Sequence, residues 1–468
     1  MPGKNIPISL APLSLLVGIS CAISVAAEKA NVVTFDDHVK PILRQYCLKC
    51  HGNDEQNADL NLQHYATLLE GGSAGAVVKA GQADASILYL AITNQDDAAR
   101  MPPESPPIPA AAIATIRSWI NTGLRESTRS KALSAQRTIT FSPSATASQK
   151  PDGPPAMPAK LPPIALPTQQ RPLAILALAA SPWAPLAAAS GHQHIRLWNT
   201  ETEQEIGQLP FPEGIPYVLK FSQNGDLLLA AGGQPGHSGS VVLYNVRTGN
   251  IVGRFGDELD AVMAADISPD QKIVALGGPG RTVKAYATAT GKQLYQLTRH
   301  TDWITAIAFS PDGKQIATAD RSGNLHLSDA SRGGILLSLA NHKASIRSVA
   351  WRSDSRILTS AGDDGRLIWW DATSGFVAMQ NTNAHPPARP AGYTGKLRNG
   401  ILSVRFRRDG KLVSAGRDHH VRLWKTSSDQ TSSLHVETAI PTQVTVDHTG
   451  QKQILGDAAG QLRFWQAK

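Results

Sequence analysis

Hydrophobic and polar positions divide the chain into two regions with different periods. Between residues 35 and 122, apolar side chains recur three and four positions apart, which is the spacing of one helix face. From residue 172 onward, short apolar runs of strand length alternate with turn sequences such as Ser-Pro-Asp-Gly, a pattern typical of successive antiparallel strands. We therefore expect a small all-α domain followed by a larger all-β domain.

Three helices are predicted in the first region. The apolar face of the first helix runs from Phe35 to Cys47. Proline is tolerated in the first turn of a helix but not in its interior, so Pro41 indicates that the regular helix begins at Val39 or Lys40. The second is predicted over 85–92 and the third over 110–122. Gly123 is the expected stop of the third helix.

The β region repeats itself about every forty residues. One strand-end position recurs at intervals of 46, 42, 42, 42, 54 and 41 residues, and it is filled by Trp198, Tyr244, Tyr286, Ser328, Trp370, Trp424 and Trp465. Seven such repeats predict a closed β-propeller with seven blades. The last repeat stops after its third strand, and residues 163–168 are expected to supply the missing outer strand.

The stretch Cys47-Leu48-Lys49-Cys50-His51 ends the first predicted helix. C-x-x-C-H is the attachment sequence of a c-type haem, because two thiols at this spacing reach both vinyl groups of one porphyrin while the imidazole falls under the iron. A redox dithiol or half of a zinc site is the alternative, but no third cysteine follows Cys50. The motif predicts one covalent haem c, with His51 as the proximal iron ligand.

Met101 is the expected distal ligand of the iron. It is the one methionine between the N-terminal segment and the linker, and it stands in Arg100-Met101-Pro102-Pro103. Prolines stiffen a loop that holds a weak thioether ligand. His64, in a polar stretch, is the competing candidate.

The first 27 residues resemble a secretory signal. They carry one charge, Lys4, and then an uncharged apolar run with small residues at Val25 and Ala27 before the expected cleavage site. A retained membrane anchor is the alternative. Cleavage leaves Cys47 and Cys50 as the cysteines of the mature chain, so no structural disulfide is expected. We expect export to the periplasm or to the outer side of the cytoplasmic membrane.

The net charge of +8 is distributed unevenly. Residues 28–126 hold eight Lys and Arg against twelve Asp and Glu, whereas the residues after 126 sum to +11. The basic part favours an acidic partner or docking within the chain. Nucleic acid is not expected as a partner of an exported protein.

Ser, Thr, Ala and Pro dominate residues 125–161 without apolar periodicity, which predicts a flexible linker.

The first region carries a series of motifs at fixed places: Phe35-x3-Val39-x-Pro41-Ile42-Leu43-x3-Cys47-x2-Cys50-His51, Gly71-Gly72, Lys79-x-Gly81, Ser86-x-Leu88-Tyr89, Arg100-Met101-Pro102 and Trp119-Ile120-x2-Gly123. On these motifs it resembles the planctomycete-type cytochrome c domain. The resemblance implies haem attachment at Cys47 and Cys50 with His51 proximal and Met101 distal. In the second region, residues 367–371 and 421–424 resemble WD40 repeats closely. The expected domains are a signal peptide (1–27), a cytochrome c domain (28–124), a linker (125–161) and a WD40-like propeller (162–468).

WD40 blades are often braced by a hydrogen-bonded His, Ser or Thr, Asp and Trp set. The fifth repeat carries a full set, which consists of His342, Ser360, Asp364 and Trp370. The sixth has Asp418 and Trp424, but we expect an insertion of about a dozen residues to displace its candidate histidine, His385. These residues are interpreted as architecture and not as a catalytic set.

One face of the propeller is expected to carry two candidate sites. Five histidines fall in or beside its loops and form a candidate metal or second-cofactor site: His192, His194, His237, His419 and His420. The insertion at 386–397, which contains Arg389, Tyr393 and Lys396, is the better candidate for contact with a partner.

Three functional hypotheses follow. The first is an exported electron carrier with a haem, whose propeller docks a redox partner. The second is a haem-fed oxidoreductase with its active site on the propeller. The third is a redox-sensing scaffold protein. A count of seven WD40-like blades favours electron transfer over conversion of a substrate, because the nitrite reductases that join cytochrome c to a propeller have eight blades and a special haem.

Overall fold

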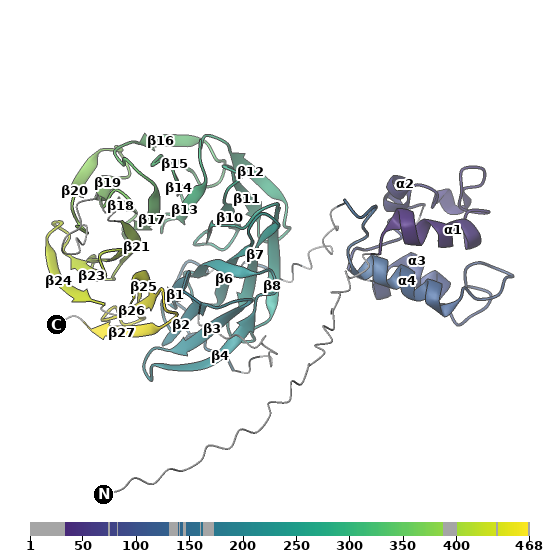
Figure 1. The fold of residues 1–468 in the computed structure, drawn as a ribbon, viewed down its shortest axis with the longest axis horizontal. Coiled ribbons are helices and arrows are strands. Elements are labelled where there is room, and N and C mark those ends of the chain that lie inside the picture. Colours follow the sequence, from purple (N-terminus) through teal and green to yellow (C-terminus); the bar gives the residue numbers. More distant parts are fainter. Residues whose placement is uncertain are drawn as a thin grey trace, which may run out of the picture. The chain divides into compact units, whose positions relative to one another are not determined.

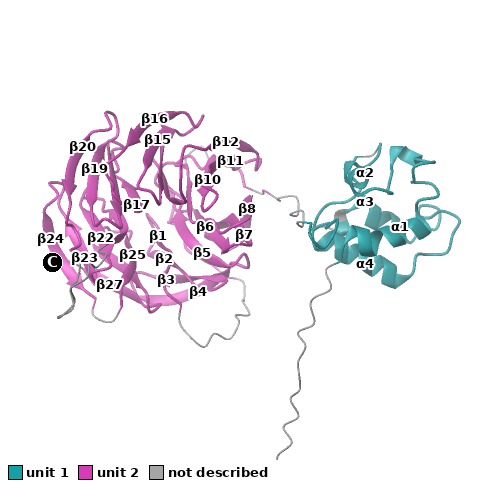
Figure 2. Ribbon diagram, turned by 45° about the horizontal axis from the view of Figure 1, so that its top comes forward, with its two compact units in different colours: residues 1–136 teal, residues 137–468 magenta. Residues whose placement is uncertain are grey.

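The structure is a computed structural model, which describes residues 33–73, 75–81, 83–130, 139, 141–143, 147–159, 161, 173–386, 400–436 and 439–466. The chain divides into two compact units, residues 1–136 and 137–468 (Figure 2). The described part of the first unit is helical and that of the second consists of strands. The prediction of a small all-α domain before an all-β domain is therefore confirmed. No described helix has the length and apolar character needed to cross a membrane. The predicted signal segment lies outside the described residues.

Short helices surround one apolar core in the first unit. They are η1 (Phe35–Val39, a π-helical turn), α1 (Lys40–Tyr46), η2 (Asn57–Asp59), α2 (Tyr65–Glu70), η3 (Ala83–Ala85), α3 (Ile87–Ile92) and α4 (Ala110–Asn121). Pro41 stands in the first turn of α1, where its missing N–H group removes no helical hydrogen bond. The three predicted helices are present, and α2 is an additional one.

Helix α4 ends where its sequence predicts. It buries Ile116, Trp119 and Ile120 in the core of the unit, and it ends at Asn121. Gly123 has a φ of 95°, a conformation that glycine adopts without steric cost. The N–H groups of Gly123 and Leu124 donate to carbonyl oxygens of the last helical turn.

Residues just after α4 are part of the helical unit. The carbonyl oxygen of Arg125 accepts from the Trp119 indole N–H at 2.9 Å and from the Phe35 backbone N–H at 2.7 Å. The Tyr65 hydroxyl donates to the Leu124 carbonyl at 2.6 Å. The start of the predicted linker at 125 is therefore held by the helical domain.

The second unit is a ring of seven antiparallel sheets (Figure 1). Each strand pairs with the next one in sequence, so each sheet is a meander that forms one blade. The strands are, blade by blade, β1 (Leu178–Ala180), β2 (Leu186–Ser190), β3 (His194–Asn199) and β4 (Gln204–Pro210); β5 (Ile215–Phe221), β6 (Leu227–Gln234), β7 (Ser238–Asn245) and β8 (Ile251–Glu258); β9 (Ala264–Ile267), β10 (Ile273–Gly277), β11 (Val283–Ala287) and β12 (Gln293–Leu297); β13 (Ile304–Phe309), β14 (Gln315–Asp320), β15 (Leu325–Asp329) and β16 (Ile335–Leu339); β17 (Ile346–Trp351), β18 (Ile357–Gly362), β19 (Leu367–Asp371) and β20 (Val377–Asn381); β21 (Ile401–Phe406), β22 (Leu412–Gly416), β23 (His420–Trp424) and β24 (Gln430–His435); β25 (Pro441–Val446), β26 (Lys452–Asp457) and β27 (Leu462–Gln466).

The repeat positions found in the sequence mark the blades. Each of the seven recurring residues from Trp198 to Trp465 lies in the third strand of its sheet. The prediction of seven blades is confirmed, and within the described residues the seventh sheet has three strands. The predicted donor of a fourth strand, residues 163–168, lies outside the described residues.

Blades one and seven close the ring. The Ile175 N–H donates to the Asp457 carbonyl at 3.0 Å, and the Gln443 side-chain amide donates to the Leu176 carbonyl at 3.0 Å. An apolar cluster joins the same two blades, with Leu178 from β1 and Ile454 from β26 among its buried members.

Part of the predicted linker packs on the propeller. Ala156 is buried in a core cluster shared with blades one and two, and Ala147 is also buried. The Arg247 side chain donates to the Pro154 carbonyl at 2.7 Å, and the Ala159 N–H donates to the Arg247 carbonyl at 3.0 Å. The prediction of a flexible linker over all of 125–161 is therefore wrong for residues 147–159.

Candidate functional site

The C-x-x-C-H motif lies at the end of α1. Cys47 is the C-cap of this helix, and its N–H group donates to the Leu43 carbonyl at 2.8 Å. The His51 N–H donates to the Cys47 carbonyl at 3.0 Å, so the motif continues the helix as a turn. Both cysteines are free and partly exposed. The local fold thus places two thiols and one imidazole within a single turn.

Two features of this turn bear on its chemistry. Burial raises the pKa of the Cys47 thiol to about 11, so the group is a neutral thiol at pH 7. A redox dithiol needs the opposite shift, because the thiolate is the reactive form. The His51 Nδ1 atom is buried and has no hydrogen-bond partner. A buried polar atom without a partner costs free energy, which fits a ring that gains one when a ligand binds.

Met101 lies on a loop that is attached to α3. Its backbone N–H donates to the Ala91 carbonyl at 3.0 Å. In the described part of the helical unit, the exposed large hydrophobic side chains are Ile87 (44% exposed), Leu90 (50%) and Met101 (42%). All three belong to α3 or to the loop attached to it. An apolar surface of this kind fits a unit that covers it with a large apolar group.

The backbone of His64, the competing candidate for the distal ligand, has a structural role. His64 is the N-cap residue of α2, and its carbonyl accepts from the Leu68 N–H at 3.0 Å. Its side chain is exposed. The residues of the motif and of the Met101 loop therefore fit a haem: two thiols for attachment, an imidazole with an unused ring nitrogen, and an exposed thioether beside an apolar helix face.

The predicted brace of blade five is present. His342 Nδ1 lies 3.0 Å from an Asp364 carboxylate oxygen, and its Nε2 lies 2.7 Å from the Ser360 hydroxyl. The Trp370 indole N–H donates to the same hydroxyl at 2.8 Å. These side chains satisfy one another's hydrogen-bonding groups inside the blade, so the set has a structural role.

Blade six has the same brace, so the prediction that the insertion displaces His385 is wrong. His385 is fully buried; its Nδ1 lies 2.7 Å from Asp418 and its Nε2 lies 2.6 Å from the Ser414 hydroxyl. The Trp424 indole N–H donates to Ser414 at 2.8 Å. Arg422 pairs with the second Asp418 oxygen at 2.6 Å. The insertion begins after His385, so the histidine keeps its place.

Blade four carries a brace that sequence reasoning missed. His300 Nδ1 lies 2.9 Å from Asp320, and its Nε2 lies 2.8 Å from the Thr318 hydroxyl. Ser328 occupies the tryptophan position, and its buried hydroxyl has no hydrogen-bond partner. Asp320 stands eight residues before Ser328, whereas Asp364 stands six before Trp370. The equal spacing of 18 residues between His and Ser or Thr in blades four and five was the available signal.

The five loop histidines do not form a metal site in this structure. His194, His419 and His420 each hold a backbone carbonyl oxygen with Nδ1, at 2.7, 3.1 and 2.7 Å. Among the residues that the structure describes, no three His, Cys, Asp or Glu side chains gather within reach of one metal ion. The insertion residues Arg389, Tyr393 and Lys396 lie outside the described residues.

The fold and the site define a class: a small cytochrome c-like helical domain joined to a β-propeller. The comparison with family models agrees. Residues 47–105 match the model described as planctomycete cytochrome C, a span that includes both cysteines, His51 and Met101. Residues 291–329, 333–371 and 391–425 match the WD domain, G-beta repeat. The chain therefore joins a planctomycete-type cytochrome c domain to a seven-bladed WD40 propeller. A search of the curated proteins finds no match.

Proposed function

We propose that the chain is an exported c-type cytochrome that transfers electrons through one haem. Cys47 and Cys50 attach the haem through thioether bonds, His51 is the proximal ligand and Met101 the distal one. The observation that carries the proposal is the C-x-x-C-H turn after α1, with two free thiols and an unused His51 nitrogen, inside the span that matches planctomycete cytochrome C. When bound, the haem supplies reversible one-electron chemistry.

The propeller serves as the docking platform for a redox partner. Strands alternate in direction within each blade, so the loop before β13 and the loop after β14 lie on the same face. Trp303, in the first loop, is 40% exposed, and the Arg321 guanidinium lies 4.9 Å from the centre of its ring. Exposed Trp and Arg are the residue types that anchor protein interfaces. The excess of basic residues after residue 126 favours an acidic partner.

The double variant Cys47→Ala with Cys50→Ala tests the haem assignment. We expect it to lose covalently bound haem while the propeller stays folded, because the two units have separate cores. Haem staining after denaturing electrophoresis and circular dichroism measure the two outcomes. Cys21→Ala, which changes the third cysteine of the chain, is the matched control and should keep its haem. Covalent haem retained in the double variant would overturn the assignment.

Haem and metal analysis of the purified holoprotein tests the electron-transfer role. We expect one equivalent of iron, all of it accounted for by haem. A second redox cofactor in the propeller would instead favour the haem-fed oxidoreductase.

A further inference from the structure

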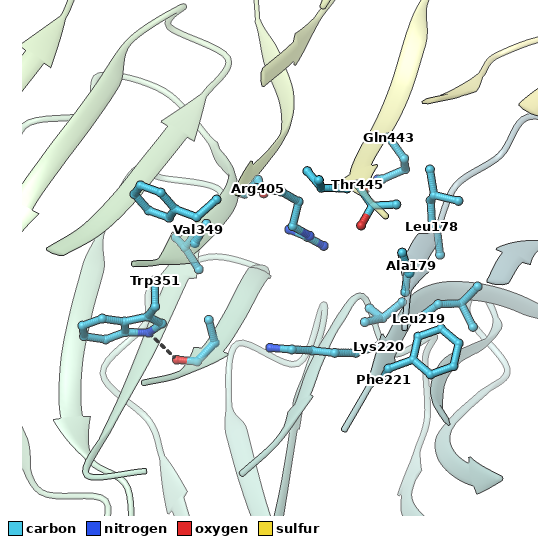
Figure 3. Close-up of a pocket in the computed structure, with 18 of the residues that line it drawn as sticks. Leu178, Ala179, Leu219, Lys220, Phe221, Val349, Trp351, Arg405, Gln443 and Thr445 are labelled. Atoms are coloured by element: carbon cyan, nitrogen blue, oxygen red, sulfur yellow. Dashed lines mark hydrogen bonds between the residues drawn. The ribbon is translucent and has the colours of Figure 1, made fainter. Parts of the chain in front are cut away.

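The inner strands of the propeller enclose a cavity of about 540 Å³. All seven blades contribute to its wall, through β1, β5, β9, β13, β17, β21 and β25. Apolar and polar groups contribute about equally to the surface of this wall, and Leu178, Leu219 and Val349 are among the apolar side chains that line it (Figure 3). Its volume lies in the range of sites that hold small molecules, roughly 300–1,000 Å³.

The charged side chains that line the cavity are mainly cationic. They are Lys220, Arg347, Arg405, Arg407, Arg408 and a carboxylate, Asp447. The Asp447 carboxylate is engaged in its own turn, where it accepts from the N–H groups of Gln451 and Lys452 and from the Thr449 hydroxyl. Arg347 is neutralised by Asp363, which lies outside the lining, at 2.7 Å.

Arg405 has no such counter-ion. Within the described residues no carboxylate lies at salt-bridge distance from its guanidinium, and its Nη1 donates at 2.9 Å to the carbonyl of the neighbouring Val404. The nearby carboxylate, Asp266, is fully buried and already pairs with Lys220 and with the Phe309 N–H group. The two cations Lys220 and Arg405 thus lie near the same carboxylate, Asp266.

Two further observations concern the cations of the same region. Burial lowers the pKa of Arg405, and the charge of Asp266 opposes the shift. Arg407, two residues further along the chain and also in the lining, is 13% exposed and pairs with Asp409 at 3.3 Å, while its Nε atom has no hydrogen-bond partner. Arg405 is a partly buried cation without a counter-ion among the described residues, which is costly, so a bound anion would stabilise it.

We propose that the central cavity of the propeller binds a small oxyanion, a carboxylate or phosphate group, at Arg405 and Lys220. Figure 3 shows both side chains extending into the same space, Arg405 from β21 and Lys220 from β5. The planar guanidinium of Arg405 offers paired donors that match two oxygens of such a group. The apolar part of the wall suits the carbon skeleton of a small organic acid or phosphate ester. The site is independent of the haem domain.

Calorimetric titration of the full chain tests the proposal. Inorganic phosphate and succinate are the two probes, each at constant ionic strength with chloride as the reference anion. We expect saturable binding of at least one probe, and the better probe identifies the class of oxyanion. Arg405→Gln should weaken that binding about ten- to hundredfold, the effect of losing a charged hydrogen-bond donor. Binding of neither probe, or equal binding by Arg405→Gln, would overturn the proposal.

Two controls separate binding from folding. Arg332→Gln removes the same charge from the exposed turn after β15 and should leave binding unchanged. Without added anion, Arg405→Gln should unfold at the parent temperature or above it, because it removes an uncompensated charge. If Arg405→Gln does not fold, Arg405→Lys keeps the charge without the paired donors and should bind the probe more weakly. Parent-like affinity in Arg405→Lys would then contradict the guanidinium role.

Discussion

The serine of the blade-six brace offers a quantitative test of how the propeller is stabilised. His385 Nδ1 lies 2.7 Å from an Asp418 oxygen and 2.7 Å from an Arg422 nitrogen, and the opposite ring nitrogen, Nε2, lies 2.6 Å from the Ser414 hydroxyl. The Ser414 hydroxyl also accepts from the Trp424 indole N–H at 2.8 Å. Ser414→Ala therefore removes both contacts at once.

The expected cost follows from the two groups left without partners. Ser414, His385 and Trp424 are all buried, so water does not replace the lost hydroxyl without entering the blade. Each orphaned buried polar group costs about 1–3 kcal/mol, which gives about 2–6 kcal/mol for the variant. Ser360→Ala in blade five removes the equivalent pair of contacts and should cost a similar amount.

Ser328→Ala is the matched control. Ser328 is as buried as Ser414, but its hydroxyl has no hydrogen-bond partner, so its removal should leave stability unchanged or raise it slightly. Urea unfolding of the full chain, followed by tryptophan fluorescence, compares the three variants with the parent. Equal effects of Ser414→Ala and Ser328→Ala would refute the reasoning, because the hydrogen bonds would then contribute nothing beyond the loss of a hydroxyl.

Three other predictions concern the distal ligand, acid stability and the packed linker. Met101→Ala should lower the reduction potential of the holoprotein by on the order of 0.1 V, within the roughly 0.8 V span set by axial ligands; an unchanged potential and spectrum in voltammetry and absorbance would point to His64. Burial lowers the pKa of His300 and His385 below 6.5, against the opposing effect of Asp320 and Asp418, so the stability of the propeller should be complete above pH 6.5 and decline as the pH falls. Thermal melts from pH 8 to 5 measure this, and His385→Gln should flatten the dependence; a midpoint that rises on acidification would contradict it. Ala156→Asp places a charge in the cluster shared with blades one and two and should release residues 147–159 to limited proteolysis, whereas resistance equal to the parent would argue against that packing.

Most of the architecture could be predicted from the sequence because the propeller consists of sequence repeats. A tryptophan, tyrosine or serine in each third strand marks every blade, and α4 has both a clear apolar face and a glycine stop. Helix α2 is only six residues long, Tyr65–Glu70, which is too short for a helical period to stand out.

What the sequence did not predict depends on contacts between distant residues. The separation of 29 residues between His385 and Ser414 implied displacement, but His385 precedes the extra residues and keeps its contacts with Asp418 and Ser414. Residues 147–159 pack through single alanines and backbone hydrogen bonds, which leave no period in the sequence. The cavity charges depend on which inner-strand side chains face the ring centre and which carboxylates reach them. The sequence of a single strand predicts neither the direction of these side chains nor the carboxylates near them.

Peptide mapping of the purified holoprotein by mass spectrometry tests the central claim most directly. After extraction of any non-covalent haem, the peptide that contains residues 47–51 should carry one haem joined through both Cys47 and Cys50. Free or disulfide-bonded thiols in that peptide, with all haem lost to extraction, would contradict the account.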